Sequence, residues 1–129
     1  MLTKLWIGGK PVAARSGKTS PVTNPADGAL VARVAEGGAE DIDAAVDAAV
    51  TAAGGVWSKL HARERGKILL KISVLIREHA DELALLECRS AGKPLGDTHD
   101  EMGLAADTFE YYGGAANKHF GETIPAAGS

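Results

Sequence analysis

The chain has 129 residues, enough for one domain, and its 14 basic and 17 acidic side chains give a formal net charge of −3. No basic block is present, which argues against a nucleic-acid-binding protein, because phosphate contacts need clustered Lys and Arg. One cysteine cannot form an internal disulfide, and no apolar run is long enough for a signal peptide or a membrane span. We therefore expect a cytoplasmic protein that binds neither nucleic acid nor membrane.

The first third of the chain predicts strands and turns. Residues 5–7 and 11–13 flank a Gly-Gly pair, which indicates a β-hairpin because glycine tolerates the positive φ of a tight turn. Residues 21–25 should be extended, since the residue before a proline is pushed out of the helical region. A second strand candidate follows at residues 30–35.

From residue 38 the apolar period becomes helical, which predicts a first helix that ends at Gly54-Gly55. Glu40, Asp41 and Asp43 lie where the dipole of a helix N-terminus favours acids. The apolar positions form one stripe: Ile42, Val46, Ala49, Val50 and Ala53.

Three more helices are expected. One covers residues 62–79, and its apolar side chains occupy more than one face, so it should be buried on several sides. The next carries Cys88 and stops at Gly92, before Pro94. The last covers residues 97–118, where apolar residues recur at helical spacing.

Local motifs predict no phosphate or metal site. Residues 17–19 end like a P-loop, but the glycine that must lead such a loop is replaced by Val12. Four potential metal ligands crowd one helical turn, where their side chains point in different directions, and acids there also stabilise a helix N-terminus. These four residues are Asp97, His99, Asp100 and Glu101.

Cys88 is expected to be a structural residue. A cysteine nucleophile needs cationic neighbours or a helix N-terminus to form the thiolate, and donors that hold an oxyanion. Cys88 instead follows Glu87 and lies among aliphatic residues, so we interpret it as a small hydrophobic side chain.

Several segments, taken in order and with their separations, carry a family resemblance. They are WIGGK at residues 6–10, VTNP at 22–25, DIDAAV at 41–46, Trp57, Arg65, AGKPL at 91–95, FEYYGG at 109–114 and GETIP at 121–125. This series closely resembles the N-terminal portion of the aldehyde dehydrogenase superfamily, and the resemblance runs over nearly the whole chain.

The resemblance implies an α/β fold that is part of a Rossmann-like coenzyme-binding domain. Residues 1–125 would be the incomplete start of that domain, with an N-terminal strand pair followed by about four helices that cover one side of a parallel sheet. Residues 126–129 would be a flexible tail. Most strands of the sheet would come from sequence beyond Ser129.

The family oxidises aldehydes to carboxylic acids with NAD or NADP, using a cysteine thiolate, a glutamate that activates water and an asparagine that holds the oxyanion. The resemblance implies that all these groups lie downstream of GETIP, so no residue here is assigned to catalysis or coenzyme binding. We expect the isolated chain to be inactive and to bind neither coenzyme. Its partners would be an aldehyde in the complete enzyme, and the remainder of the fold or identical subunits. The alternative is a non-enzymatic helical assembly or regulatory module derived from that family.

Two further sites follow from the resemblance. Glu101, Leu104 and Thr108 match the helix face that borders the mouth of the substrate tunnel in several family members. Some members also bind a monovalent cation through carbonyls matched by Val22 and Thr23. Ser90 replaces the acid of that site, so we expect no metal there.

Overall fold

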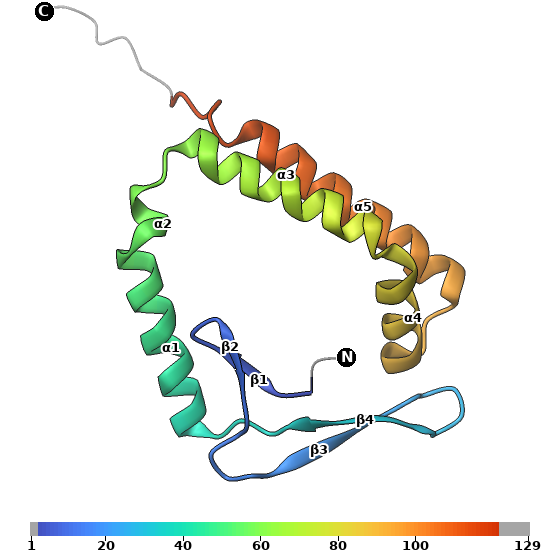
Figure 1. Cartoon of the computed structure of the whole chain (residues 1–129). Helices are drawn as coiled ribbons and strands as arrows, with labels where there is room; N and C mark the ends of the chain where they lie inside the picture. The colour runs from blue at the N-terminus through green and yellow to red at the C-terminus, as the bar shows by residue number, and fades with distance from the viewer. Residues whose placement is uncertain (1–2, 122–129) are drawn as a thin grey trace, which may run out of the picture.

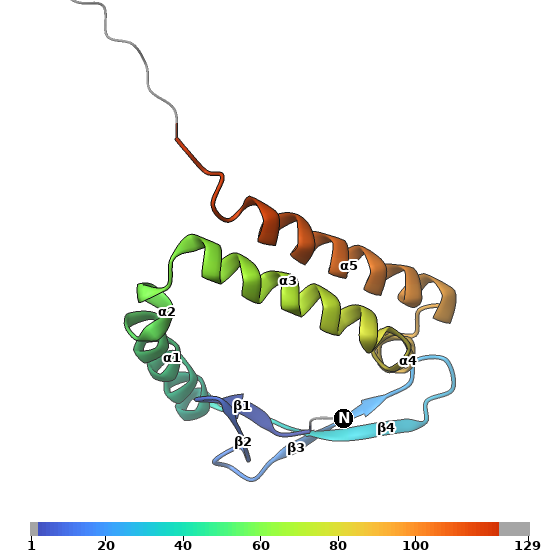
Figure 2. The same ribbon diagram turned by 45° about the horizontal axis from the view of Figure 1, so that its top comes forward.

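The computed structural model describes residues 3–121, which form two antiparallel strand pairs and five helices (Figures 1 and 2). Strand β1 (Leu5–Ile7) pairs with β2 (Lys10–Val12), with Trp6 opposite Pro11. Gly8 and Gly9 connect them with φ values of 59° and 76°, so the predicted hairpin is confirmed.

Strand β3 (Thr19–Thr23) pairs with β4 (Leu30–Ala35), and the register shifts at Val22/Thr23. The sequence predicted extended backbone in both regions, but it did not predict that the two segments pair with each other. The described residues therefore contain two strand pairs rather than one. Pro21 is tolerated within β3 because a two-stranded sheet leaves each strand an edge that needs no N–H donor.

The helices are α1 (Ala39–Gly54), α2 (Val56–Lys59), α3 (Ala62–Glu78), α4 (Ala80–Ala91) and α5 (Leu95–Ala115). Four of them match the four predicted helices. The single turn α2 was not predicted, because four residues are too short to show a helical period. Helix α5 begins and ends earlier than expected, since Pro94 is its N-cap and two glycines weaken its last turn.

Helices α3 and α5 run side by side in opposite directions, and α4 lies across the end where α3 finishes and α5 begins (Figures 1 and 2). The α3 and α5 backbones approach closely at glycines. A Cβ atom on Gly113 would lie 3.0 Å from Cγ of Leu70. Helix α1 packs on β1 and leads through α2 to this helical group.

The described residues enclose very little apolar core. Among residues 3–121 the buried apolar side chains are only Ala14, Ala84 and Ala106. On α3, the side facing α5 buries Gly66 and Ser73, whereas Ile68 and Leu75 are 40% and 42% exposed. Other large apolar side chains, including Val74, Leu104 and Tyr112, are exposed as well. The expected burial of α3 on several sides is not met within the described residues, where the helix packs mainly on α5; that it needs further partners stays a prediction.

Among residues 3–121, no helix combines the length and the apolar character needed to cross a membrane. The predicted tail at residues 126–129, and all of the GETIP segment except its first residue, lie outside the described residues.

Candidate functional site

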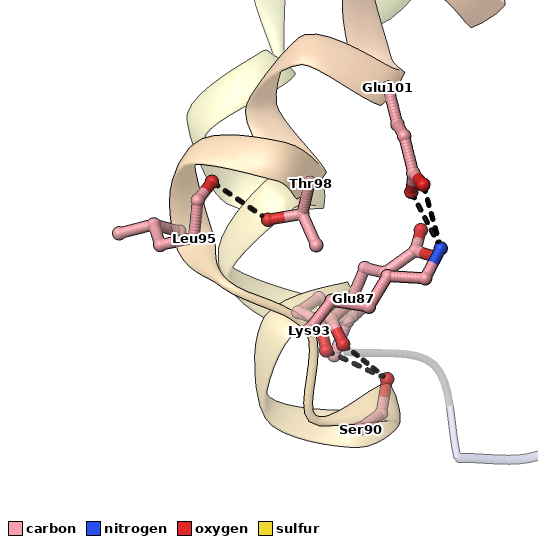
Figure 3. A network of polar contacts seen from close by, with 7 residues as sticks. Glu87, Ser90, Lys93, Leu95, Thr98 and Glu101 are labelled. Carbon is pink, nitrogen blue, oxygen red and sulfur yellow. Dashed lines mark hydrogen bonds and ion pairs between the residues drawn. The ribbon is translucent and has the colours of Figure 1, made fainter.

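Lys93 joins two helices through a cluster of charged side chains (Figure 3). Its Nζ lies 2.9 Å from Oε1 of Glu87 on α4, and 2.9 and 2.7 Å from the two carboxylate oxygens of Glu101 on α5. The hydrogen bonds to Glu101 and then to Glu87 raise the pKa of Lys93 above its usual value. The three side chains are 34–41% exposed, and one ammonium is shared by two carboxylates, so they form a small, partly exposed ion-pair network.

Local backbone chemistry places this cluster at the corner between α4 and α5. Gly92 ends α4 in the left-handed conformation (φ 75°), and its N–H donates to the Cys88 carbonyl oxygen at 2.9 Å. Gly92 also lies against Pro25, whose Cβ would be 3.0 Å from a Cβ added at this position. Thr98 is fully buried in the first turn of α5, and its hydroxyl donates to the Leu95 carbonyl at 2.9 Å (Figure 3).

The three residues assigned to a tunnel mouth lie along α5 at spacings of three and four residues. Glu101 is held by Lys93, Leu104 is 65% exposed, and the Thr108 hydroxyl donates to the Leu104 carbonyl at 2.9 Å. This part of α5 therefore presents one exposed apolar side chain, flanked by two polar groups that already have partners within the chain.

Leu104 also borders a surface hollow of about 530 Å³ between the end of α3 and the first half of α5. Arg77 crosses this hollow: its Nη2 lies 2.9 Å from Asp107 and 2.7 Å from Glu110. Hydrogen bonds to Asp107 and Glu110 raise the pKa of Arg77. The single guanidinium offsets only one of the two carboxylates, and the residues that line the hollow include no paired nucleophile and base of the kind that covalent catalysis requires.

The other candidate residues are not assembled into a site. Ser90 is exposed on the last turn of α4, and its hydroxyl donates to the Leu86 carbonyl at 2.8 Å. Val22 is half-buried on β3 and Thr23 is exposed. Across residues 3–121, no three His, Cys, Asp or Glu side chains converge as a metal centre would require. Cys88 is a half-buried free thiol on α4, and its structural role stays a prediction.

Sequence reasoning missed three polar clusters, one of which is the group around Arg77 described above. The Lys93 cluster could have been suspected from Glu87 and Glu101, which lie six and eight residues away. The third cluster centres on Asp41, which is 5% exposed and whose carboxylate accepts the N–H groups of Gly38 at 3.0 Å and Arg15 at 3.1 Å. The contact with Gly38 is a local helix cap, but Arg15 is 26 residues away and no local pattern points to it.

Known proteins resemble this chain over almost its whole length. A model of the aldehyde dehydrogenase family matches residues 12–129. Aldehyde dehydrogenase family 2 member B4 of Arabidopsis thaliana, named as mitochondrial, is 46% identical over 129 residues, which are 98% of this chain and 24% of that protein.

Solved structures agree with the sequence match. An aldehyde dehydrogenase variant from Bacillus cereus superposes with a TM-score of 0.92 and 39% identity, over 98% of this chain and 26% of that one. A betaine aldehyde dehydrogenase variant from Staphylococcus aureus, in complex with NAD⁺, gives 0.90 and 33%, over 97% and 25%. The chain thus spans about a quarter of the length of these relatives. The family model, the sequence identity and the shared fold together establish that the chain belongs to the aldehyde dehydrogenase family.

Proposed function

We propose that this chain is the N-terminal quarter of an enzyme that oxidises aldehydes to carboxylic acids with NAD or NADP. The observation that carries the proposal is a match of 98% of this chain to 24% of a relative at 46% identity. The complex of the staphylococcal relative with NAD⁺ supports a nicotinamide coenzyme for the complete enzyme. In this proposal the enzyme works in the cytoplasm, since a free cysteine fits a reducing compartment.

The isolated chain is proposed to be inactive. Oxidation of an aldehyde through a covalent intermediate needs a nucleophile that adds to the carbonyl, donors that hold the oxyanion, a coenzyme that accepts the hydride, and a base that activates water to release the acid. The only cysteine, Cys88, is half-buried in α4, and its carbonyl closes the helix end at Gly92. We therefore assign neither a catalytic residue nor a coenzyme contact to this chain.

Within the complete enzyme, Glu101, Leu104 and Thr108 are proposed to border the entrance through which the aldehyde arrives. The exposed side chain of Leu104 supports this role, because an apolar group at an entrance can contact the body of a substrate without taking part in the reaction. Glu101 would act through its charge at that entrance, with Lys93 fixing its orientation.

An alternative is a non-enzymatic module that assembles with other chains. The many exposed apolar side chains favour some partner, either the remainder of the fold or identical subunits. The two proposals differ in whether this chain can complete an active enzyme.

A fusion protein tests the proposed function. This chain would replace the matched N-terminal quarter of the Arabidopsis relative, and reduction of NAD or NADP by added aldehydes would be followed by absorbance. We expect aldehyde-dependent reduction by the fusion and none by the isolated chain. A fusion that folds, by circular dichroism and a cooperative melt, but reduces neither coenzyme with any aldehyde would favour the assembly module.

A further inference from the structure

The backbone of Lys93 is fixed at the corner between α4 and α5 by its two neighbours in the chain. Gly92 before it adopts the left-handed conformation, with φ 75°, and Pro94 after it is the N-cap of α5. A residue that precedes a proline is restricted to extended backbone. A Cβ atom on Gly92 would stand 3.0 Å from Cβ of Pro25, so the corner also lies against the segment that follows β3. The side chain of Lys93 therefore starts from a defined position.

The ammonium of Lys93 holds the carboxylate of Glu101 by both of its oxygens (Figure 3). Nζ lies 2.9 Å from Oε1 and 2.7 Å from Oε2, and it also lies 2.9 Å from Oε1 of Glu87 on α4. Hydrogen bonds between two charged groups are shorter and stronger than those between neutral groups. The carboxylate of Glu101 is thus turned toward the α4–α5 corner, and its charge is offset by an ammonium rather than presented alone to an approaching molecule.

The next turn of α5 exposes an apolar group. Leu104, three residues after Glu101, is 65% exposed. The hydroxyl of Thr108 donates to the Leu104 carbonyl oxygen at 2.9 Å, and Asp107 is paired with Arg77 at 2.9 Å. Since both of these polar groups are engaged within the chain, a molecule that approaches this part of α5 meets an aliphatic side chain.

We propose that Lys93 is a specificity-determining residue that offsets the charge of Glu101, so that the entrance favours uncharged aldehydes with an apolar body over cationic ones. The inference rests on the proposed function, which puts Glu101 and Leu104 at that entrance. A free carboxylate attracts a cation that passes within a few ångströms, and an ammonium bound to the carboxylate opposes this attraction. Lys93 acts through Glu101 and not on the reacting atoms, so it is a positioning residue.

Two aldehydes of the same shape test this inference in the fusion of this chain with the Arabidopsis relative. Betaine aldehyde carries a trimethylammonium group, and tert-butylacetaldehyde has the same skeleton with a carbon atom in place of the nitrogen. The measured quantity is kcat/KM for the cation divided by kcat/KM for its neutral counterpart. We expect K93M to raise this ratio about three- to tenfold, mainly through a lower KM for the cation, because it removes a positive charge near the entrance.

Three further variants separate the effect of charge from that of structure. K93R keeps a cation that can bind both carboxylates, so its ratio should stay near that of the wild type. K93M/E101Q has no carboxylate at position 101 to release, so the rise should disappear. K67M removes a lysine from an exposed pair on α3 and should leave the ratio unchanged. Damage to the corner alone would slow the oxidation of both aldehydes and would not change their ratio.

An active fusion whose ratio is the same in the wild type and K93M would overturn the inference and leave the proposed function standing. A rise that persists in K93M/E101Q would also overturn it, because Lys93 would then act without Glu101. A folded fusion that oxidises no aldehyde would reject the proposed function and this inference with it.

Discussion

Gly66 of α3 lies so close to Gly113 of α5 that a Cβ atom at position 66 would stand 2.6 Å from the Gly113 carbonyl oxygen. Backbone cannot yield as a flexible side chain can, so Gly66→Ala must push the two helices apart. Overpacking of this kind typically costs about 1–3 kcal/mol. We expect the free energy of unfolding, measured by urea denaturation, to fall by that amount.

Gly103→Ala is the matched control for that substitution. Gly103 lies within α5, and no atom comes within 4 Å of a Cβ built there. Alanine should stabilise the helix at this position by about 0.5–1 kcal/mol. Equal effects of the two substitutions would contradict the close approach of α3 and α5.

Asp41 should contribute more to stability than its neighbour Asp43 on the same helical turn. Asp41→Asn removes the charge that accepts two backbone N–H groups and presents an amide donor to one of them. Hydrogen bonds to a charged group are worth about 1.5–3 kcal/mol, so a loss within that range is expected. Asp43 is exposed, and Asp43→Asn should cost about 0.3–1 kcal/mol through the helix dipole alone. Thermal melts of the two variants measure the difference.

The Lys93 cluster should make stability depend on alkaline pH. The pKa of Lys93 is raised in the folded chain, so its contribution is complete below the unfolded pKa of about 10.4 and disappears as the pH rises through the folded value. The difference in melting temperature between wild type and Lys93→Met should therefore be constant near neutral pH and shrink above about pH 10.4.

Lys67→Met provides the comparison for that experiment. Lys67 forms an exposed pair with Glu64 one turn earlier on α3, so its removal should lower the melting temperature at neutral pH less than Lys93→Met does. A constant difference for Lys93→Met over the whole alkaline range would show that its ammonium does not hold α4 and α5 together.

Glu101→Gln should change KM more than kcat in the complete enzyme. A group at the entrance binds the ground state and the transition state alike, so its loss weakens substrate binding without slowing the chemical step. Asp97→Asn, on the first turn of the same helix, serves as the control for charge alone. Equal losses in kcat and kcat/KM would instead place Glu101 beside the reacting atoms.

The isolated chain should behave as an incomplete fold. Its large apolar side chains remain exposed on α1, α3 and α5, and fully burying each such side chain is worth about 1.5–3 kcal/mol. We expect helical circular dichroism together with self-association and fluorescence of a dye that binds apolar surface. Calorimetry should detect no binding of NAD or NADP. A monodisperse monomer that binds no dye would contradict this prediction.

Local signals in the sequence were sufficient to predict one hairpin, four helices and the end of α4. The glycine pair between β1 and β2, the stop of α4 at Gly92 and the helical periods of α1, α3 and α5 all act over a few residues, so they can be read without the fold. The family could also be recognised, since its motifs occur in order along the chain. The assignment of Glu101, Leu104 and Thr108 to the tunnel mouth depends on that resemblance, and their role stays a prediction.

Contacts between distant segments were decided only by the tertiary structure. Pairing of β3 with β4, the bond from Arg15 to Asp41 and the approach of Gly66 to Gly113 each depend on how separate elements are placed in space. A sequence pattern records which face of a helix is apolar, but not what will cover it. The helical period therefore predicted the apolar stripe on α1. Its exposure could be known only from the structure, which shows that Ile42, Val46 and Val50 are not covered by the described residues.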